Sequence, residues 1–178
     1  MMNKELFSDN IAIFYGQFYI DIAESDDEDE EYLDMESAFE GQSNGLCGAS
    51  HEGKLFFIVG PQDGMAKVTI ELHDVEPDLL EGFDDIVECS FKPTNDDLHL
   101  CEWSHEETHL LNLPAGEYVV RYSAKNLAKD YGDDDDWDAP VKGQEYIIQF
   151  WSGFLAADHV IRSNTEVGQY WHQEMRSK

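Results

Sequence analysis

Short apolar segments, alternating with polar residues and separated by turn residues, recur along most of this chain. Residues 110–124, LLNLPAGEYVVRYSA, show the pattern best. Pro114 opens a Pro-Ala-Gly turn, in which proline fixes φ and glycine permits positive φ. After the turn, Tyr118 and Tyr122 are expected on one face of a strand and Arg121 on the other. The sequence therefore predicts a hairpin here and a β-rich fold overall.

The same pattern predicts further strands between other turn signals. They are expected at residues 11–22, 54–59, 65–73, 86–91, 98–103 and 145–151. Residues 11–22 are interpreted as one long strand with a bulge at Gly16, and residues 61–64 as the turn of a hairpin. Helices are expected at residues 32–40 and after Ser163, which has capping-box spacing to Glu166. About eight short strands with a few short helices predict an antiparallel β-sandwich, with a closed β-barrel as the alternative.

The length of 178 residues, 42% of them hydrophobic, predicts a single β-sandwich domain over residues 1–178. Two acidic segments, residues 24–31 and 130–138, are expected to be loops in this domain. Like charges at that density repel one another and offer no apolar surface to bury, so solvated loops are the natural structure for both segments.

The charge of the chain limits its partners. Aspartate and glutamate number 39 against 11 lysines and arginines, which gives a formal net charge of −28. Such a field repels nucleic acid and anionic membranes and attracts basic proteins. The excess is not confined to the two acidic segments, since residues 68–91 carry eight acids and no lysine or arginine. We therefore expect a basic protein partner, while solubility alone is the alternative explanation of the charge.

Three cysteines are too few, and odd in number, for a disulfide framework, so a reduced cytoplasmic setting is expected. The first ten residues contain no apolar stretch typical of a signal peptide. No run of residues approaches the length of an apolar membrane span.

The sharpest match to a catalytic motif is His105-Glu106-Glu107-Thr108-His109, an H-E-x-x-H pattern. A zinc hydrolase needs this motif on a helix, so that both imidazoles share one face and the glutamate activates water. Here Pro114 follows five residues after the second histidine, and residues 110–113 are expected to be a strand. We therefore favour a polar hairpin tip and keep a metal-dependent hydrolase as an alternative function.

Cys47, with His51 four residues further on, is the candidate for a thiol nucleophile and its base. A reactive thiol needs a helix N-terminus or a cationic neighbour, and the sequence shows neither, so a buried packing cysteine is expected. The acidic segments lack the spacing of a calcium loop, and no phosphate-binding or dinucleotide motif is present. The sequence therefore predicts no cofactor and no bound metal.

Several short motifs resemble bacterial proteins of the competence-associated nuclease-inhibitor family and a related uncharacterised bacterial group. The motifs are Tyr15-Gly16-Gln17-Phe18, Gly45-Leu46-Cys47-Gly48-Ala49, His73-Asp74-Val75-Glu76-Pro77, Leu113-Pro114-Ala115-Gly116-Glu117-Tyr118 and Gln149-Phe150-Trp151. This resemblance implies a small β-rich protein that blocks a nuclease.

Taken together, these features predict a non-enzymatic acidic inhibitor or immunity protein that occludes a basic partner such as a nuclease toxin. A generic β-sandwich binding module is a further alternative, and its sign would be exposed aromatic residues on one face. The acidic segments and one tryptophan are the expected contact residues, because they mimic the charge of a nucleic-acid backbone and add an aromatic anchor. They are Asp26, Asp27, Asp29, Glu30, Glu31, Asp133, Asp134, Asp135, Asp136 and Trp137.

Overall fold

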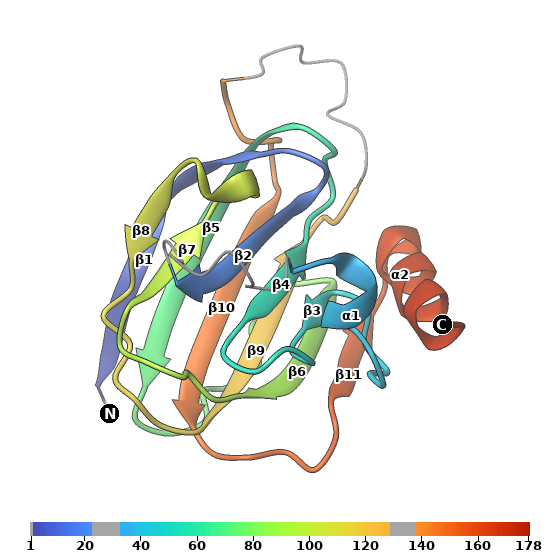
Figure 1. Ribbon diagram of the computed structural model, residues 1–178. Coiled ribbons are helices and arrows are strands. Elements are labelled where there is room, and N and C mark those ends of the chain that lie inside the picture. The colour runs from blue at the N-terminus through green and yellow to red at the C-terminus, as the bar shows by residue number, and fades with distance from the viewer. Residues whose placement is uncertain (1, 23–32, 129–137) are drawn as a thin grey trace.

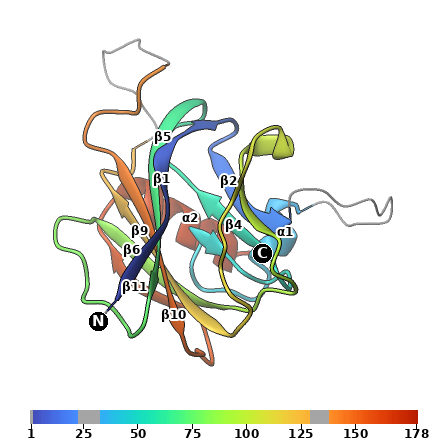
Figure 2. The same ribbon diagram turned by 90° about the vertical axis from the view of Figure 1, so that its left-hand side faces the viewer.

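The computed structural model describes residues 2–22, 33–128 and 138–178. The strands form two sheets that face each other (Figures 1 and 2). From edge to edge, the six-stranded sheet contains β1 (Asn3–Ile13), β5 (Gly64–His73), β10 (Glu145–Ser152), β9 (Tyr118–Lys125), β6 (Asp85–Phe91) and β11 (His159–Ser163). The five-stranded sheet contains β3 (Cys47–Gly48), β4 (Leu55–Ile58), β2 (Gln17–Ile22), β7 (Leu98–Cys101) and β8 (Thr108–Leu110). The predicted β-sandwich is confirmed, and the closed barrel is not what forms.

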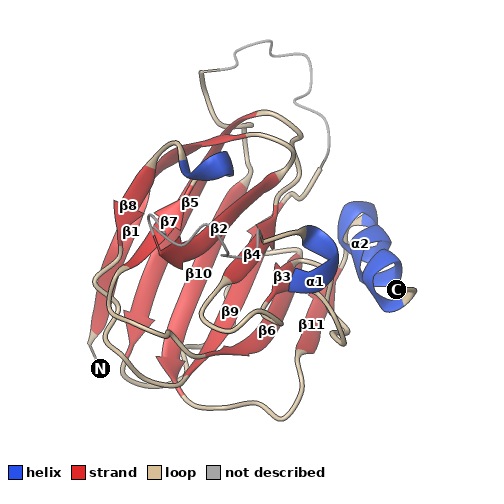
Figure 3. Cartoon of the chain, viewed as in Figure 1, coloured by secondary structure: helices blue, strands red, loops and turns tan. Residues whose placement is uncertain are grey.

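Helices are few and short, as Figure 3 shows. They are α1 (Met35–Ala38), the 3-10 turn η1 (Trp103–His105) and α2 (Glu166–Arg176). The helix expected at residues 32–40 is a single turn, and α2 is capped by Thr165 instead of Ser163. The hydroxyl of Thr165 accepts a hydrogen bond from the backbone N–H of Gly168 at 3.0 Å. Within the described part of the chain, no helix is long and apolar enough to cross a membrane.

The core lies between the two sheets and is rich in aromatic rings. Phe18 of β2 stacks on Phe57 of β4 at 4.9 Å between ring centroids, and Phe57 meets the edge of Tyr122 from β9 at 5.1 Å. Burial of each such side chain stabilises the fold by about 1.5–3 kcal/mol. The hydroxyl of Tyr122 also donates a hydrogen bond to the carbonyl oxygen of Ile58 at 2.8 Å, which ties the two sheets together. The face that the sequence assigns to Tyr118 and Tyr122 is the one that packs in the core.

The turns expected to form hairpins instead carry the chain from one sheet to the other. The single strand predicted at residues 11–22 is wrong, because the chain reverses at Tyr15 and Gly16, with φ of +57° and +66°. The hairpin predicted at residues 110–124 is also wrong, since β8 and β9 belong to different sheets, and β4 and β5 are separated in the same way. A turn sequence specifies where the chain reverses, but pairing between strands depends on contacts that are distant in sequence.

The six-stranded sheet is not entirely antiparallel. β10 runs parallel to β5 and antiparallel to β9, while β6 runs antiparallel to β9, so β5 and β6 run in the same direction. Residues 74–84, which we call the strap, must therefore cross the outer face of β10 and β9. Arg121 on that face donates a hydrogen bond to the carbonyl oxygen of Pro77 in the strap at 2.7 Å. The strap explains why Arg121 is only 1% exposed although it points away from the core.

Candidate protein-binding surface

The predicted contact residues in the two acidic segments lie outside the described residues, so their role stays a prediction. Their attachment points are described. Residues 23–32 connect the end of β2 to Leu33, two residues before Met35 in α1. Residues 129–137 begin directly after Ala128, and a Cβ atom at Gly60 would clash with the carbonyl oxygen of this alanine. Met35 is therefore close in sequence to one attachment point, and Gly60 is in close contact with Ala128 at the other.

The H-E-x-x-H motif lies at the connection between the antiparallel strands β7 and β8, as expected for a polar hairpin tip. His105 ends η1 and His109 lies in β8, so the two imidazoles do not share a helix face. Nε2 of His105 is 3.2 Å from a carboxylate oxygen of Asp21, whereas Nε2 of His109 is 3.6 Å from Glu102. Among residues 2–22, 33–128 and 138–178, no three or more histidine, cysteine or acidic side chains are grouped to hold a metal ion. This geometry does not support the zinc hydrolase alternative.

Cys47 and His51 do not form a nucleophile–base pair. The sulfur of Cys47 lies 3.4 Å from that of Cys89 in the core, and burial raises the pKa of the Cys47 thiol well above its ordinary value. Nε2 of His51 is hydrogen-bonded to the hydroxyl of Ser37 at 2.8 Å. The expectation of a buried packing cysteine is confirmed.

An exposed aromatic cluster, formed by Phe14, Tyr15 and Trp103, lies where the β1–β2 turn meets η1. Phe14 is 44% exposed and Tyr15 is 59% exposed, and the Trp103 ring lies 5.1 Å from that of Tyr15. The φ of Tyr15 is positive, which is common for glycine but rare for a residue with a bulky side chain. Strained residues of this kind concentrate at functional sites, and exposed aromatic residues are enriched at protein interfaces. The aromatic cluster is therefore a candidate contact surface.

Tyr15 also lines a groove of about 490 Å³, which we call the Tyr15 groove. Five separate parts of the fold contribute to it: the β1–β2 turn, the start of β2, α1, the β4–β5 connection and α2. The lining residues are residues 15–17, Met35, residues 59–60, Gln62 and Trp171.

Hydrogen bonds fix the walls of the Tyr15 groove. The N–H of Gly16 donates to the carbonyl oxygen of Gln62 at 2.8 Å, and the N–H of Val59 donates to the carbonyl oxygen of Gly16 at 3.0 Å. The N–H of Gly60 donates to the buried hydroxyl of Tyr146, from the opposite sheet, at 3.0 Å. A site held in this way needs little reorganisation when a partner binds.

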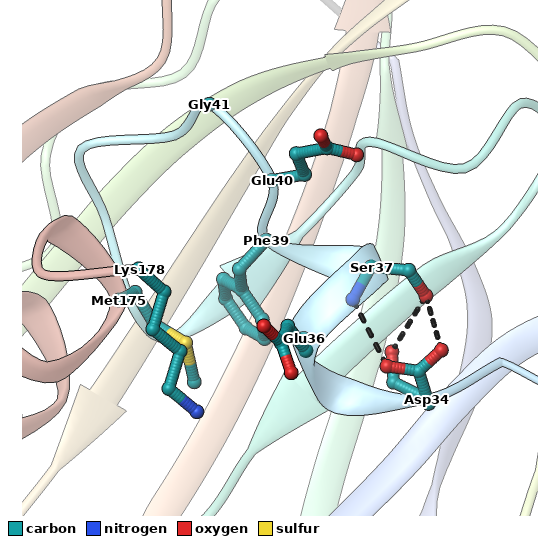
Figure 4. A pocket seen from close by; sticks show the side chains of 8 residues that line it. All are labelled: Asp34, Glu36, Ser37, Phe39, Glu40, Gly41, Met175 and Lys178. Carbon is teal, nitrogen blue, oxygen red and sulfur yellow. Dashed lines mark hydrogen bonds between the residues drawn. The ribbon is translucent and has the colours of Figure 1, made fainter.

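A second hollow of about 430 Å³ is lined by other residues in and around α1, and Figure 4 shows its lining side chains. Asp34, Glu36 and Glu40 supply three carboxylates to it, against one ammonium group from Lys178. The side chain of Ser37 donates to the Asp34 carboxylate at 2.6 Å, and this hydrogen bond lowers the pKa of Asp34. Asp34 and Glu36 adjoin Met35 in the sequence, while their side chains line a hollow that is separate from the Tyr15 groove.

Lysine and arginine are nearly absent from the layer formed by the five-stranded sheet, α1 and η1. Residues 14–22 and 33–59 together contain five acidic side chains and one basic side chain, Lys54, while residues 93–120 contain six acidic and no basic side chains. These described stretches include every strand of the five-stranded sheet together with α1 and η1. The ammonium group of Lys54 forms an ion pair with Asp21 at 3.3 Å. The layer that carries the aromatic cluster is thus strongly negative.

Asp21 contributes to this negative charge although it is buried. Burial alone would raise the pKa of Asp21. Hydrogen bonds from His105 and from the backbone N–H of Ile22, together with the charge of Lys54, instead hold this pKa below its usual value. The carboxylate is therefore ionised under ordinary conditions.

The remaining exposed aromatic side chains do not share a sheet face with the aromatic cluster. Phe154, 71% exposed, follows β10 in a loop, and Tyr170, 48% exposed, lies on α2. Among the described residues, the exposed aromatic side chains do not form the single aromatic face that would indicate a generic binding module.

Sequence reasoning did not identify Tyr15, Met35, Trp103 and Trp171 as site residues. One signal was available for Tyr15, because the Tyr-Gly pair combines a bulky residue with a turn glycine. Trp171 was expected only as part of a short helix, and its place in the Tyr15 groove depends on how α2 packs.

The fold and this surface define a class: a two-sheet β-sandwich with one strongly acidic layer and an exposed aromatic surface. No protein-family model matches the sequence, and no curated protein sequence matches it either. Among solved structures, the chain is similar to ComJ from Bacillus subtilis, an inhibitor of the DNA-degrading activity of NucA. The two share 19% identity over 86% of this chain and 100% of ComJ, with a TM-score of 0.57. The crocagin biosynthetic gene J protein is also similar, with 16% identity over 85% of this chain and 99% of that chain and a TM-score of 0.53.

Both similarities show a shared fold. The predicted resemblance to the competence-associated nuclease-inhibitor family is confirmed at that level, because ComJ is such an inhibitor.

Proposed function

We propose that this protein is a non-enzymatic inhibitor that binds a basic protein, a nuclease, and blocks its access to DNA. The observation that carries the proposal is the aromatic cluster with its strained Tyr15, set at a five-stranded sheet whose strands, with α1 and η1, contain no lysine or arginine. The shared fold with ComJ, an inhibitor of a DNA-degrading enzyme, supports the same assignment. A DNA-binding cleft is basic, so it is attracted to the acidic layer.

Two kinds of contact have different roles in the proposed complex. The acidic segments, with Asp26, Asp27, Asp29, Glu30 and Glu31 in one and residues 133–137 in the other, take the place of the DNA phosphates. Their charges accelerate association by electrostatic steering. The aromatic cluster and the Tyr15 groove supply the close contacts that keep the complex together, since buried aromatic anchors carry most of the binding energy at interfaces.

The cytoplasm is the compartment that we propose for this activity. All three cysteines are free, and Cys47 and Cys89 remain thiols although their sulfur atoms are 3.4 Å apart. Free thiols at such a distance suit a reducing environment.

The test is a DNA-degradation assay in which the purified full-length protein is titrated against NucA and against the nuclease encoded nearest to its gene. The expected result is loss of nuclease activity at a stoichiometric ratio with at least one enzyme, weakened by added salt. Full activity of both nucleases in the presence of excess protein at low salt would overturn the proposal.

The matched control is the double variant Asp78→Asn, Glu81→Gln. Both side chains are exposed on the strap, which covers the opposite sheet. This variant removes two carboxylate charges that lie away from the five-stranded sheet, on the far side of the molecule. It is expected to inhibit as well as the unchanged protein.

A further inference from the structure

We propose that the Tyr15 groove receives an arginine side chain of the partner protein, which stacks on the rings of Tyr15 and Trp171. This inference rests on the proposed function, because it names the chemical group that the inhibitor recognises. It concerns only described residues and does not depend on the two acidic segments.

The lining of the groove matches a guanidinium group. Two aromatic residues, Tyr15 and Trp171, line the groove, and aromatic rings are what a planar cation stacks on. The amide side chains of Gln17 and Gln62 and the thioether of Met35 complete the polar and apolar lining. Arginine carries five N–H donors and an apolar stem, so it uses rings, amide oxygens and apolar surface at the same time.

Charge complementarity selects a cation over other occupants. The lining contains no lysine or arginine and no carboxylate, while Asp34, Glu36 and Asp63 adjoin lining residues in the sequence. An acidic or neutral side chain gains nothing from that field. Lysine gains less than arginine, because a strongly hydrated ammonium group lacks the planar face that stacks on the two rings.

The volume and rigidity of the groove also fit one inserted side chain. The volume of about 490 Å³ leaves room for a whole arginine side chain. The hydrogen bonds from Gly16, Val59 and Gly60 hold the walls before binding. The strained conformation of Tyr15 then serves to present its ring at the rim.

The variant that tests the inference is Tyr15→Asn. Asparagine tolerates positive φ, so the turn is kept while the ring is removed, and the folded state is expected to remain at least as stable. Inhibition of the nuclease is expected to weaken by about tenfold or more, as for loss of a central aromatic anchor. The matched control is Phe154→Ala, which removes an aromatic side chain that is 71% exposed outside the groove and is expected to leave inhibition unchanged.

A second measurement does not require a nuclease. Short oligo-arginine, oligo-lysine and oligo-glutamate peptides are added to the full-length protein, and the indole N–H resonance of Trp171, assigned with Trp171→Phe, is followed by NMR. The arginine peptide is expected to shift this resonance at a lower concentration than the lysine peptide, and the glutamate peptide is expected not to shift it. Equal responses to arginine and lysine would overturn the choice of arginine.

The two proposals fail in different ways. If the unchanged protein inhibits a nuclease and Tyr15→Asn inhibits equally well, the groove inference is wrong and the inhibitor proposal stands. If neither nuclease is inhibited but the arginine peptide still binds at Trp171, the inhibitor proposal is wrong and the groove retains its specificity.

Discussion

Nδ1 of His172 on α2 accepts a hydrogen bond from the backbone N–H of Gly45 at 2.9 Å. This bond joins the C-terminal helix to the loop that precedes β3, and it requires a neutral imidazole. His172 is 4% exposed, and its burial, followed by the positive charge of Arg176, lowers its pKa to about 4. Asp158 opposes this shift without cancelling it.

The stability of the fold should therefore depend on pH through His172. The unfolded chain binds a proton at this histidine near pH 6.5, whereas the folded protein resists protonation down to about pH 4. The free energy of unfolding should fall as the pH decreases through this window, by about 3 kcal/mol in total. Urea denaturation of His172→Gln, which keeps an acceptor but does not titrate, should show a shallower decline. Identical declines in both proteins would contradict this role.

Replacing Arg121 with methionine should destabilise the protein strongly. Nη2 of Arg121 lies 2.7 Å from a carboxylate oxygen of Glu88, and both side chains are buried. The variant leaves Glu88 buried without a counter-charge, which costs about 3–5 kcal/mol in chemical denaturation.

The control for this substitution is Lys92→Met. The ion pair between Lys92 and Glu117 is well exposed on both sides, so its loss should change stability by less than about 1 kcal/mol. Arg121→Met should also accelerate hydrogen exchange in the strap, because it removes the donor that holds Pro77. Equal effects of the two substitutions would show that the buried pair does not hold the strap.

The thiols of the folded protein should react very slowly with thiol reagents. Cys47, Cys89 and Cys101 are all buried, and burial, with the nearby charge of Asp21, raises the pKa of Cys101 to about 12. All three thiols should react rapidly when the protein is unfolded in urea. Fast labelling of Cys47 in the native protein would instead favour a thiol enzyme.

The acidic segments and the aromatic cluster should affect different rate constants of binding. Neutralising the acids at residues 24–31 should lower the association rate constant, by about tenfold at low salt, with little change in dissociation. Tyr15→Asn should mainly raise the dissociation rate constant, because packed anchors determine how long a complex lasts. Stopped-flow binding to the inhibited nuclease measures both constants. An association rate that is unchanged from low salt to about 1 M would contradict electrostatic steering, since exposed charges are screened there.

Much of the local structure could be predicted from the sequence. The alternation at residues 65–73 predicted β5, and the pattern after Pro114 predicted that Tyr118 and Tyr122 share one face of a strand, which is the face in the core. These predictions succeeded because strand formation and side-chain orientation depend on residues that are close together in the chain.

The identity of neighbouring strands could not be predicted in the same way. Tyr15-Gly16 and the turn at residues 61–64 encode reversals of the chain, but each reversal leads into the opposite sheet. The burial of Arg121 could not be predicted from the sequence either. The alternation along its strand places this side chain on the face opposite Tyr122, and only the strap makes that position buried.

The sequence by itself determined the β-rich class, the excess of acidic residues and the turn glycines, because these are properties of composition and short-range pattern. Only the tertiary structure decided that Tyr15, Met35 and Trp171 line one groove, and that Lys54 is paired with Asp21. The physical reason is that these neighbours come from separate elements of the chain, and they meet only when burial of the two sheet faces brings those elements together.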